Sequence, residues 1–435
     1  MLGLRKFLLV ALLSAGAGPA LAETELATEE AAMVEWIDAQ APAVEALIER
    51  LVNINSGTMN HAGVRAVGEI LGAELTSLGF AVEWISMPPE LNRAGHLFAR
   101  RTGERGSKLL LIGHLDTVFE RDDPFQTFER EGTWARGPGV DDMKSGDVII
   151  VNALKALAEI GALEGTQIVV AYTGDEESAG DPIAVSRRDL IEAGKWADVA
   201  LEFEAGMRDA QTEWATTARR SSTTWRLEVR GRQAHSSQIF TPEVGAGAIF
   251  EAARILSAFY TELRGEPYLS FNAGTIVGGT EIVYDPEVTR GEAFGKTNVV
   301  PSGAVVHGGI RTLSDEQLER ARAAMRGIVA RSLPHTSATI MFDEGYPAMA
   351  PTEGNERLRE MLSDVNVALG RGPMPALDPS RRGAADISFV APYADSLAGL
   401  GAYGAGGHSR EERLDLASVP LAVKRAAILI YRLTR

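Results

Sequence analysis

Apolar and polar positions follow two alternating periods through the first half of the chain. Segments with apolar residues three and four positions apart are separated by short, almost fully apolar runs. The helix-like segments include 67–78 and 144–160, and the apolar runs lie at 81–85, 108–112, 166–172 and 199–203. Such an alternation is typical of a mainly parallel sheet covered by helices. We therefore predict an α/β domain here.

The pattern changes near residue 221. The following segments read in the order β-α-β-β-α-β, which describes a small ferredoxin-like α+β unit with an exposed sheet face or edge. Strands are expected at 223–229, 269–277, 298–310 and 338–342, and helices at 244–263 and 314–331. An exposed edge could pair with a second copy of the chain.

Helix and strand alternation resumes after residue 346 and ends in a helix over 416–433. The last stretch should therefore complete the first domain. We expect one domain formed by 23–217 and 347–435, with the small α+β unit inserted at 218–346 and a double-linked hinge between them.

The first 22 residues have the features of a secretion signal. Arg5 and Lys6 precede an apolar stretch over 7–18, and Ala20-Leu21-Ala22 forms a small-residue cleavage site. The apolar stretch is shorter than the about 20 residues that a membrane span needs. We expect export, cleavage after Ala22 and a periplasmic or secreted product that no longer contacts the membrane, with an uncleaved anchor as the alternative.

Composition narrows the chemistry. The 435 residues are 45% hydrophobic and 23% charged, as in ordinary globular proteins. A net charge of −16 argues against nucleic-acid binding. The chain has no cysteine, which excludes disulfides and thiolate ligands. Any metal ion must therefore be bound by histidine, aspartate and glutamate.

Potential metal ligands follow four of the apolar runs. They are His114 and Asp116 after 109–112, Asp175, Glu176 and Glu177 after 168–172, Glu204 after 199–203, and His408 after 397–403. Ligands in open α/β sheets collect at the carboxyl ends of the strands, so one site is expected. Asp141 and Asp142 lie between a glycine-rich turn and a helix, where capping alone is the alternative. Each residue taken singly could also belong to a solvated turn.

Together these residues suit a pair of divalent ions. Imidazole and carboxylate ligands with a bridging acid can hold two ions about 3.5–4 Å apart. Zinc is the first choice for this mixture of nitrogen and oxygen donors, with cobalt or manganese possible. Because Glu176 and Glu177 are adjacent, one could bind metal while the other accepts a proton from water.

Seven motifs resemble, in order, those of the co-catalytic zinc exopeptidases and aminoacylases, a family that includes glutamate carboxypeptidases, succinyl-diaminopimelate desuccinylases and tripeptidases. They are GHLDTVF from Gly113, GPGVDDMKSG from Gly137, TGDEESAG from Thr173, LEFEAG from Leu201, RQAHSS from Arg232, NVVP from Asn298, and GAGGHS near the end. The resemblance covers nearly the whole chain after the leader. It is greatest to the periplasmic glutamate carboxypeptidase branch. It implies two zinc ions, a catalytic domain formed by 23–217 and 347–435, and a lid and dimerisation domain at 218–346 through which two chains form a homodimer.

The resemblance also implies a ligand set and a backbone feature. Asp142 would bridge the two ions, His114 and Glu204 would complete one, and Glu177 and His408 the other. A cis peptide bond would follow the bridging Asp142.

Further roles are implied around the ions. Glu176 would be the general base, and Asp116 would orient His114. His235 of the lid would reach the partner subunit's active site and stabilise the oxyanion. Asn298 and Arg311 would grip the substrate's free α-carboxylate.

The sequence thus predicts an exported metallohydrolase that cleaves the amide bond before a C-terminal amino acid of a small peptide or N-acyl amino acid. An aminoacylase or a di- or tripeptidase of the same family is the nearest alternative. A non-catalytic periplasmic binding protein is the alternative from another class. Arg381 and Arg382, near the expected substrate position, suggest a contact with an acidic substrate side chain.

Overall fold

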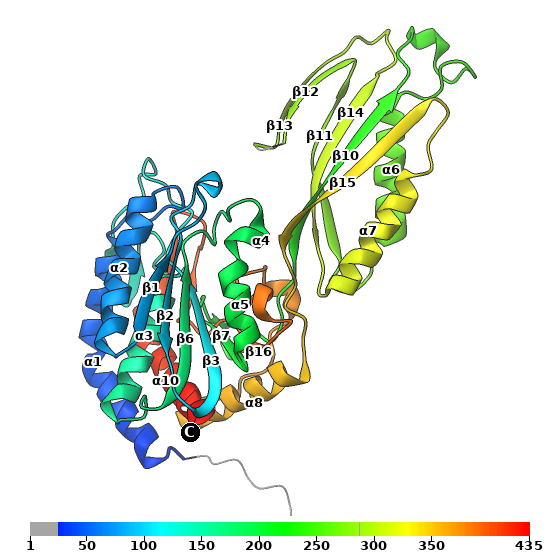
Figure 1. Ribbon diagram of the computed structural model, residues 1–435. Helices are drawn as coiled ribbons and strands as arrows, with labels where there is room; N and C mark the ends of the chain where they lie inside the picture. The colour runs from blue at the N-terminus through cyan, green and yellow to red at the C-terminus, as the bar shows by residue number, and fades with distance from the viewer. Residues whose placement is uncertain (1–24, 287) are drawn as a thin grey trace, which may run out of the picture.

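The computed structural model describes residues 25–286 and 288–435, so the expected signal segment 1–22 lies outside the described residues. Two units make up the molecule: a catalytic domain of helices around a sheet, and a narrower lid that projects from it (Figure 1). Within the described residues, no helix combines the length and apolar character needed to cross a bilayer.

The catalytic domain is built on a six-stranded sheet with the order β1-β2-β6-β3-β7-β16. Strands β6, β3, β7 and β16 are parallel, and β2 runs antiparallel to both of its neighbours. The strands are β1 (Ala81–Ile85), β2 (His96–Arg101), β3 (Arg105–His114), β6 (Thr166–Thr173), β7 (Val199–Glu202) and β16 (Asp395–Leu397). The prediction of a mainly parallel sheet is confirmed.

Helices cover both faces of this sheet. Successive side chains of the central strands point to opposite faces and are apolar on both, so each face needs its own cover. Leu109 and Leu111 of β3 join the larger apolar core, whereas Leu110 and Ile112 join the smaller one. The larger core is covered by α1 (Thr28–Val52), α2 (His61–Ser77), α3 (Lys144–Glu159), α8 (Glu353–Ala368) and α10 (Val419–Thr434). The smaller core is covered by α5 (Arg188–Trp196) and α9 (Ile387–Val390).

The two ends of the described chain meet in the catalytic domain. The C-terminal helix α10 packs with α1 and α3 in the larger core. Arg432 of α10 also forms an ion pair with the buried Glu30 of α1, 2.7 Å from Nε to Oε1. The residues after the lid therefore complete the domain that the first residues begin.

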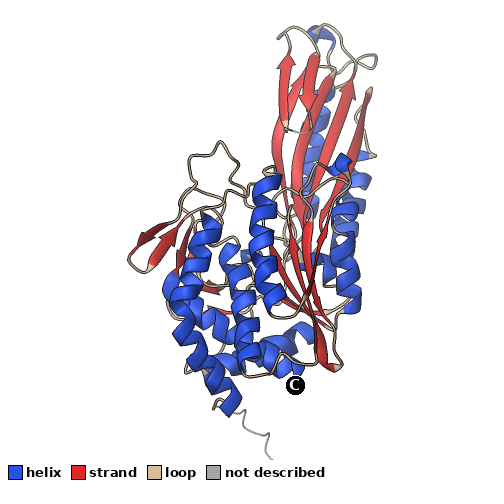
Figure 2. Ribbon diagram, turned by 60° about the vertical axis from the view of Figure 1, so that its left-hand side comes forward, coloured by secondary structure: helices blue, strands red, loops and turns tan. Residues whose placement is uncertain are grey.

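The lid is a four-stranded antiparallel sheet in the order β11-β14-β10-β15, which is the ferredoxin-like order expected from the sequence. Helices α6 and α7 cover one face (Figure 1). Its elements are β10 (Ser222–Gly231), α6 (Ala248–Leu263), β11 (Ser270–Gly279), β12 (Glu281–Asp285), β13 (Arg290–Phe294), β14 (Gly303–Arg311), α7 (Asp315–Val329) and β15 (Thr336–Tyr346). Figure 2 shows the long lid strands running beyond the catalytic domain.

Some element boundaries differ from the prediction. Helix α6 begins at Ala248 rather than 244, because Gly245 and Gly247 adopt positive φ angles of 75° and 77° that a helix does not contain. Strand β14 begins at Gly303 rather than 298. Strand β2 and the β12–β13 hairpin were not expected.

Short elements complete the structure. Small sheets are formed by β17-β18-β5-β4 and by β8-β9. The remaining elements are β4 (Glu129–Glu131), β5 (Trp134–Arg136), α4 (Ile183–Ser186), β8 (Met207–Arg208), β9 (Glu213–Trp214), β17 (Gly404–Ala405), β18 (Arg413–Asp415), and the 3-10 turns Pro89–Leu91, Ser236–Gln238, Pro379–Arg381 and Leu416–Ser418.

Candidate active site

The five residues expected to bind metal form two overlapping groups. His114, Asp142 and Glu204 make one group, and Asp142, Glu177 and His408 make the other. In each group the potential ligand atoms lie within 4.8 Å of one another. Asp142 belongs to both groups, as a residue that bridges two ions must.

The carboxylate of Asp142 lies between the two imidazoles. Its Oδ1 is 3.1 Å from Nε2 of His114, and its Oδ2 is 3.1 Å from Nε2 of His408. The same nitrogen of His408 is 3.1 Å from Oε2 of Glu177. Each oxygen of one carboxylate therefore faces a different group of ligands.

The parallel sheet explains why distant residues meet here. His114 ends β3, Glu177 follows β6, and Glu204 follows β7. These three strands are neighbours and parallel, so their carboxyl ends lie along one edge. Asp142 precedes α3, and the peptide bond Asp142–Met143 is cis, as expected from the resemblance.

Asp116 holds the segment that carries Glu176. Its Oδ1 accepts the backbone N–H of Glu176 at 2.9 Å, and its Oδ2 accepts that of Glu177 at 3.1 Å. Thr58 donates a third hydrogen bond to Oδ2 at 2.6 Å. Nδ1 of His114 lies 3.1 Å from the main-chain oxygen of Asp116 and 3.5 Å from its carboxylate. Asp116 thus contacts both the imidazole and the expected base.

Burial dominates the electrostatics of Glu176 and Glu177. It raises the pKa of Glu177 to about 7 and that of Glu176 well above its usual range. The carboxylates of Asp142 and Glu177 raise the pKa of His408 to about 11. Burial disfavours a charged His114, but its hydrogen bonds to Asp116 and Asp142 raise its pKa overall. A cation in the cluster would relieve the repulsion among these acids.

The donor chemistry fits two divalent ions. The two groups offer imidazole nitrogens and carboxylate oxygens only, with no thiolate in the chain. This mixture suits zinc, and manganese or cobalt also accept it. Ligation by these residues remains a prediction.

Sequence reasoning missed Glu412, which supports the bridging residue. This buried carboxylate accepts the backbone N–H groups of Asp141 at 2.8 Å, Asp142 at 3.0 Å and Gly139 at 3.2 Å. The nearness of Glu412 to His408 in the sequence was the only available signal that Glu412 belongs to the site.

Lys144, the residue after Met143, is also buried and donates to the main-chain oxygen of Ile54 at 2.8 Å.

Arg219 was also missed and holds Glu204. Its guanidinium pairs with the carboxylate of Glu204 at 2.6 Å and with that of Glu202. Arg382, for which we expect a contact with an acidic substrate side chain, donates to the main-chain oxygen of Ala205. Arg381 lies over the ring of Trp214, 5.7 Å from its centre. Arg382 therefore supports the segment after Glu204.

Arg311 lies at the end of the lid nearest the catalytic domain. It is the last residue of β14 and helps to line a cavity of about 300 Å³. The guanidinium of Arg311 lies against Gly383 of the catalytic domain: a β-carbon at position 383 would be 3.6 Å from Nη1 of Arg311. Burial and the nearby Arg220 lower the pKa of Arg311, and no carboxylate within the described part of the chain pairs with it.

His235 and Asn298 lie at the opposite end of the lid sheet. Main-chain contacts join them, since the N–H of Ser236 donates to the oxygen of Asn298 at 2.9 Å and His235 bridges to Val299. Asn298 precedes the first residue of β14, whereas Arg311 is the last of its nine residues, and a strand of that length spans about 27 Å at the usual rise. One chain therefore does not bring Asn298 and Arg311 together, because they flank opposite ends of the same strand.

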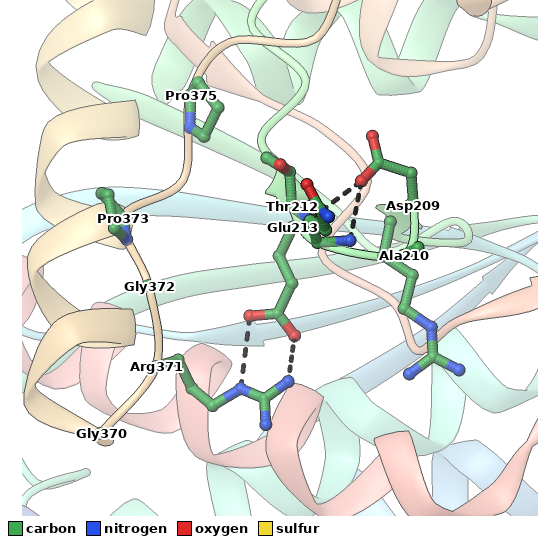
Figure 3. A pocket seen from close by; sticks show the side chains of 11 residues that line it. Asp209, Ala210, Thr212, Glu213, Gly370, Arg371, Gly372, Pro373 and Pro375 are labelled. Carbon is green, nitrogen blue, oxygen red and sulfur yellow. Dashed lines mark hydrogen bonds and ion pairs between the residues drawn. The ribbon is translucent and has the colours of Figure 1, made fainter.

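A cavity of about 800 Å³ elsewhere in the catalytic domain is lined by none of the expected ligands. Figure 3 shows its main ion pair, in which Arg371 donates to Glu213, 2.8 Å from Nη2 to Oε1. Asp209 accepts the backbone N–H groups of Gln211 and Thr212 at 3.1 Å and 2.9 Å. These charged groups are satisfied within the cavity wall, so it offers no comparable site.

Comparison with known proteins agrees with this geometry. Residues 110–432 match the family described as peptidase family M20/M25/M40. Carboxypeptidase G2 from Pseudomonas sp. is 30% identical over 407 residues, which cover 91% of this chain and 90% of that protein.

Two solved structures share the fold. Aminopeptidase PepT from Bacillus cereus has a TM-score of 0.73 at 18% identity, covering 91% of this chain and 99% of that chain. A dinuclear metal binding peptidase of the M20 family from Bacillus subtilis has a TM-score of 0.61 at 15% identity, covering 91% and 99%. With the fold and the family match together, this hydrolase belongs to peptidase family M20/M25/M40.

Proposed function

We propose that the chain is an exported di-zinc hydrolase that cleaves the amide bond before a C-terminal amino acid. The observation that carries the proposal is the position of Asp142, whose two oxygens face His114 and His408 beside the partly buried Glu176. The 30% identity to carboxypeptidase G2 supports carboxypeptidase activity over other reactions of the family.

Two zinc ions would be bound by the two groups that share Asp142, with cobalt or manganese as alternatives. Such a pair supplies a water molecule of lowered pKa and polarises the carbonyl of the scissile bond. The Bacillus subtilis relative is a dinuclear metal binding peptidase, which supports the same number of ions here.

Glu176 would take a proton from the attacking water and return it to the leaving amine. Burial raises the pKa of Glu176 toward the range in which a carboxyl group can do both. The hydrogen bonds from the backbone of Glu176 and Glu177 to Asp116 hold this base in position.

Arg311 would bind the free carboxylate of the substrate's C-terminal residue. A guanidinium binds a carboxylate through two parallel hydrogen bonds, and this one has no carboxylate partner among the described residues. An aminoacylase or a di- or tripeptidase remains the nearest alternative, because these enzymes share the chemistry and differ in what flanks the scissile bond. A binding protein without activity would not require Glu176.

We propose a homodimer in which His235 and Asn298 serve the partner's active site. Strand β11 is an edge of the lid sheet, and apolar side chains are exposed on it and near it. These side chains are Phe240, Ile249, Phe250, Tyr260 and Ile276. A second copy packed here would cover them, and His235 would then be available to stabilise the oxyanion.

Export is proposed from the sequence alone. The basic residues, apolar stretch and small-residue site within residues 1–22 support cleavage after Ala22 and release to the periplasm or the medium.

Release of free amino acids from a panel of N-acylated residues, dipeptides and folate-like conjugates tests the proposal. We expect hydrolysis of substrates with a free C-terminal carboxylate, loss of activity with a chelator, and recovery with zinc. Hydrolysis only of substrates whose carboxylate is amidated would contradict the carboxypeptidase assignment. Binding of two ions without hydrolysis of any member would favour a binding protein.

A further inference from the structure

The last residue of the lid sheet contacts the expected base. Tyr346 ends β15 and pairs with Ser222, the first residue of β10, where the chain returns to the catalytic domain. Its hydroxyl donates to the main-chain oxygen of Glu176 at 2.7 Å. One hydrogen bond therefore joins the lid strand to the backbone of the base.

A rigid group fixes the hydroxyl of Tyr346. Arg187 donates to it at 2.6 Å, and the side chain of Arg187 is fully buried. The same guanidinium pairs with Asp175 at 2.5 Å and with Asp386 at 2.6 Å. Charge-assisted bonds to two buried carboxylates leave such a group little freedom. The hydroxyl is thus held by a fixed donor while it donates to Glu176.

The ring of Tyr346 is also packed in place. It meets the ring of Phe389 edge-on with centres 5.0 Å apart, and the Arg187 guanidinium lies 5.6 Å from its centre. Burial raises the pKa of Tyr346 well above its usual value, so the hydroxyl keeps its proton and remains a donor.

The backbone of Glu176 is therefore held from two sides. Asp116 of the catalytic domain accepts its N–H, and Tyr346 of the lid donates to its carbonyl oxygen. Removing the second contact would leave the carbonyl oxygen of Glu176 without this hydrogen-bond donor. The side chain that accepts the proton extends from this same residue.

We propose that Tyr346 is a positioning residue, whose hydroxyl sets the backbone of Glu176 and so links the position of the lid to that of the general base. The inference rests on the proposed function of Glu176. Misplacing a catalytic group by about 1 Å can cost up to roughly a hundredfold in rate. Loss of one hydrogen bond should allow only part of that movement.

Tyr346→Phe removes the hydroxyl and keeps the ring. We expect kcat to fall roughly tenfold, which corresponds to the loss of about 1.4 kcal/mol of transition-state stabilisation. KM and the number of bound ions should not change. Tyr284→Phe is the matched control, because its hydroxyl bonds to His307 at 2.8 Å within the lid. A kcat equal to that of the control, or loss of metal from Tyr346→Phe, would overturn the proposal.

The Glu176→Gln background separates positioning from a general structural effect. If the hydroxyl acts through the base, adding Tyr346→Phe should lower the residual rate by less than about twofold, since contributions routed through one group are not additive. A further tenfold fall would contradict the proposal.

Hydrogen exchange provides a readout that needs no substrate. In Tyr346→Phe, the peptide around 174–179 should exchange roughly threefold faster than in Tyr284→Phe, because a backbone segment opens more readily without the hydrogen bond that holds it. Unchanged exchange would refute the role of Tyr346. If the wild-type chain hydrolyses nothing, the proposed function fails, and this measurement still decides whether Tyr346 holds the backbone of Glu176.

Discussion

The catalytic domain and the lid differ in how complete they are within one chain. In the catalytic domain, the carboxyl ends of β3, β6 and β7 bring the expected ligands into two groups that share Asp142. In the lid, by contrast, His235 and Arg311 lie near opposite ends of the same sheet. Apolar side chains on the lid's α6 and β11 are exposed.

Because of this difference, we expect metal binding and turnover to have different requirements. Parallel strands collect their following loops at one edge, so a single chain can assemble a metal site. An antiparallel sheet with functional groups at both ends cannot deliver both to one site. We therefore expect metal binding to be a property of the monomer and efficient hydrolysis to be a property of the dimer.

Asp142→Ala is the substitution in the catalytic domain from which we expect the largest effect. Because both groups use this carboxylate, the variant should lose both ions, and its activity should fall by at least about a thousandfold. Asp141→Asn is the matched control, since Asp141 is adjacent but belongs to neither group. Metal analysis by mass spectrometry and initial rates check this. Retention of one tightly bound ion by Asp142→Ala would argue against a bridging role.

Glu176→Gln should separate chemistry from metal binding. The side chain keeps nearly the same size but no longer accepts a proton, so kcat should fall roughly a thousandfold. Metal content should equal that of the wild type. Substantial residual turnover would remove Glu176 from the role of base.

Phe250→Asp should convert the proposed dimer to a monomer and so reveal whether turnover depends on contact between two lids. Phe250 of α6 is 51% exposed, and a buried charge in an interface is strongly unfavourable. We expect loss of about a hundredfold in kcat, the usual effect of removing an oxyanion donor, with both ions retained. Light scattering and metal analysis check this result.

Tyr393→Asp is the control for Phe250→Asp. Tyr393 of the catalytic domain is 49% exposed, so the same kind of charge is introduced outside the lid. Tyr393→Asp should change neither the molecular mass measured by light scattering nor kcat. If Phe250→Asp is a monomer with full activity, the proposal that efficient hydrolysis requires the dimer is wrong.

Arg311→Ala should mainly weaken substrate binding. Loss of a charged hydrogen-bonding partner for a carboxylate should raise KM by roughly ten- to a hundredfold. Arg326→Ala, on α7 and against Phe342, is the control within the lid. If the wild type hydrolyses substrates with free and with amidated carboxylates at equal rates, Arg311 does not bind the substrate carboxylate.

The smallest expected effect is the pH dependence of metal affinity. Neighbouring carboxylates raise the pKa of His408 to about 11, and burial raises that of Glu177 to about 7. Both must lose their protons to bind metal, so affinity should decrease as the pH falls. We expect a loss of about tenfold per pH unit for each proton released. Calorimetry in buffers of different ionisation enthalpy measures the number of protons, and pH-independent affinity would contradict the assignment.

Much of the fold could be predicted because apolar periodicity reports burial directly. The runs that became β3, β6 and β7 are apolar on both faces, as buried parallel strands require. Strand β2 was missed because its apolar residues are followed at once by Arg100 and Arg101. The β12–β13 hairpin was missed because most of its side chains are exposed and leave no burial pattern.

The candidate site could be predicted only where residues follow strands or match a motif. Glu412 supports Asp142 through backbone hydrogen bonds across 270 positions of the chain, which no local pattern reveals. Tyr346 contacts the backbone of Glu176 in the same way, across 170 positions. Such supporting contacts arise from the folded topology, so the sequence indicates the reacting groups better than the groups that hold them.

Complementation between two inactive variants tests the central claim most directly. Mixing His235→Ala with Glu176→Gln and allowing subunits to exchange should create one intact site in each mixed dimer. We predict recovery of about a quarter of wild-type activity, because half of the dimers are mixed and one of their two sites is complete. Activity of the mixture no higher than the average of the two variants would contradict an active site built from two chains.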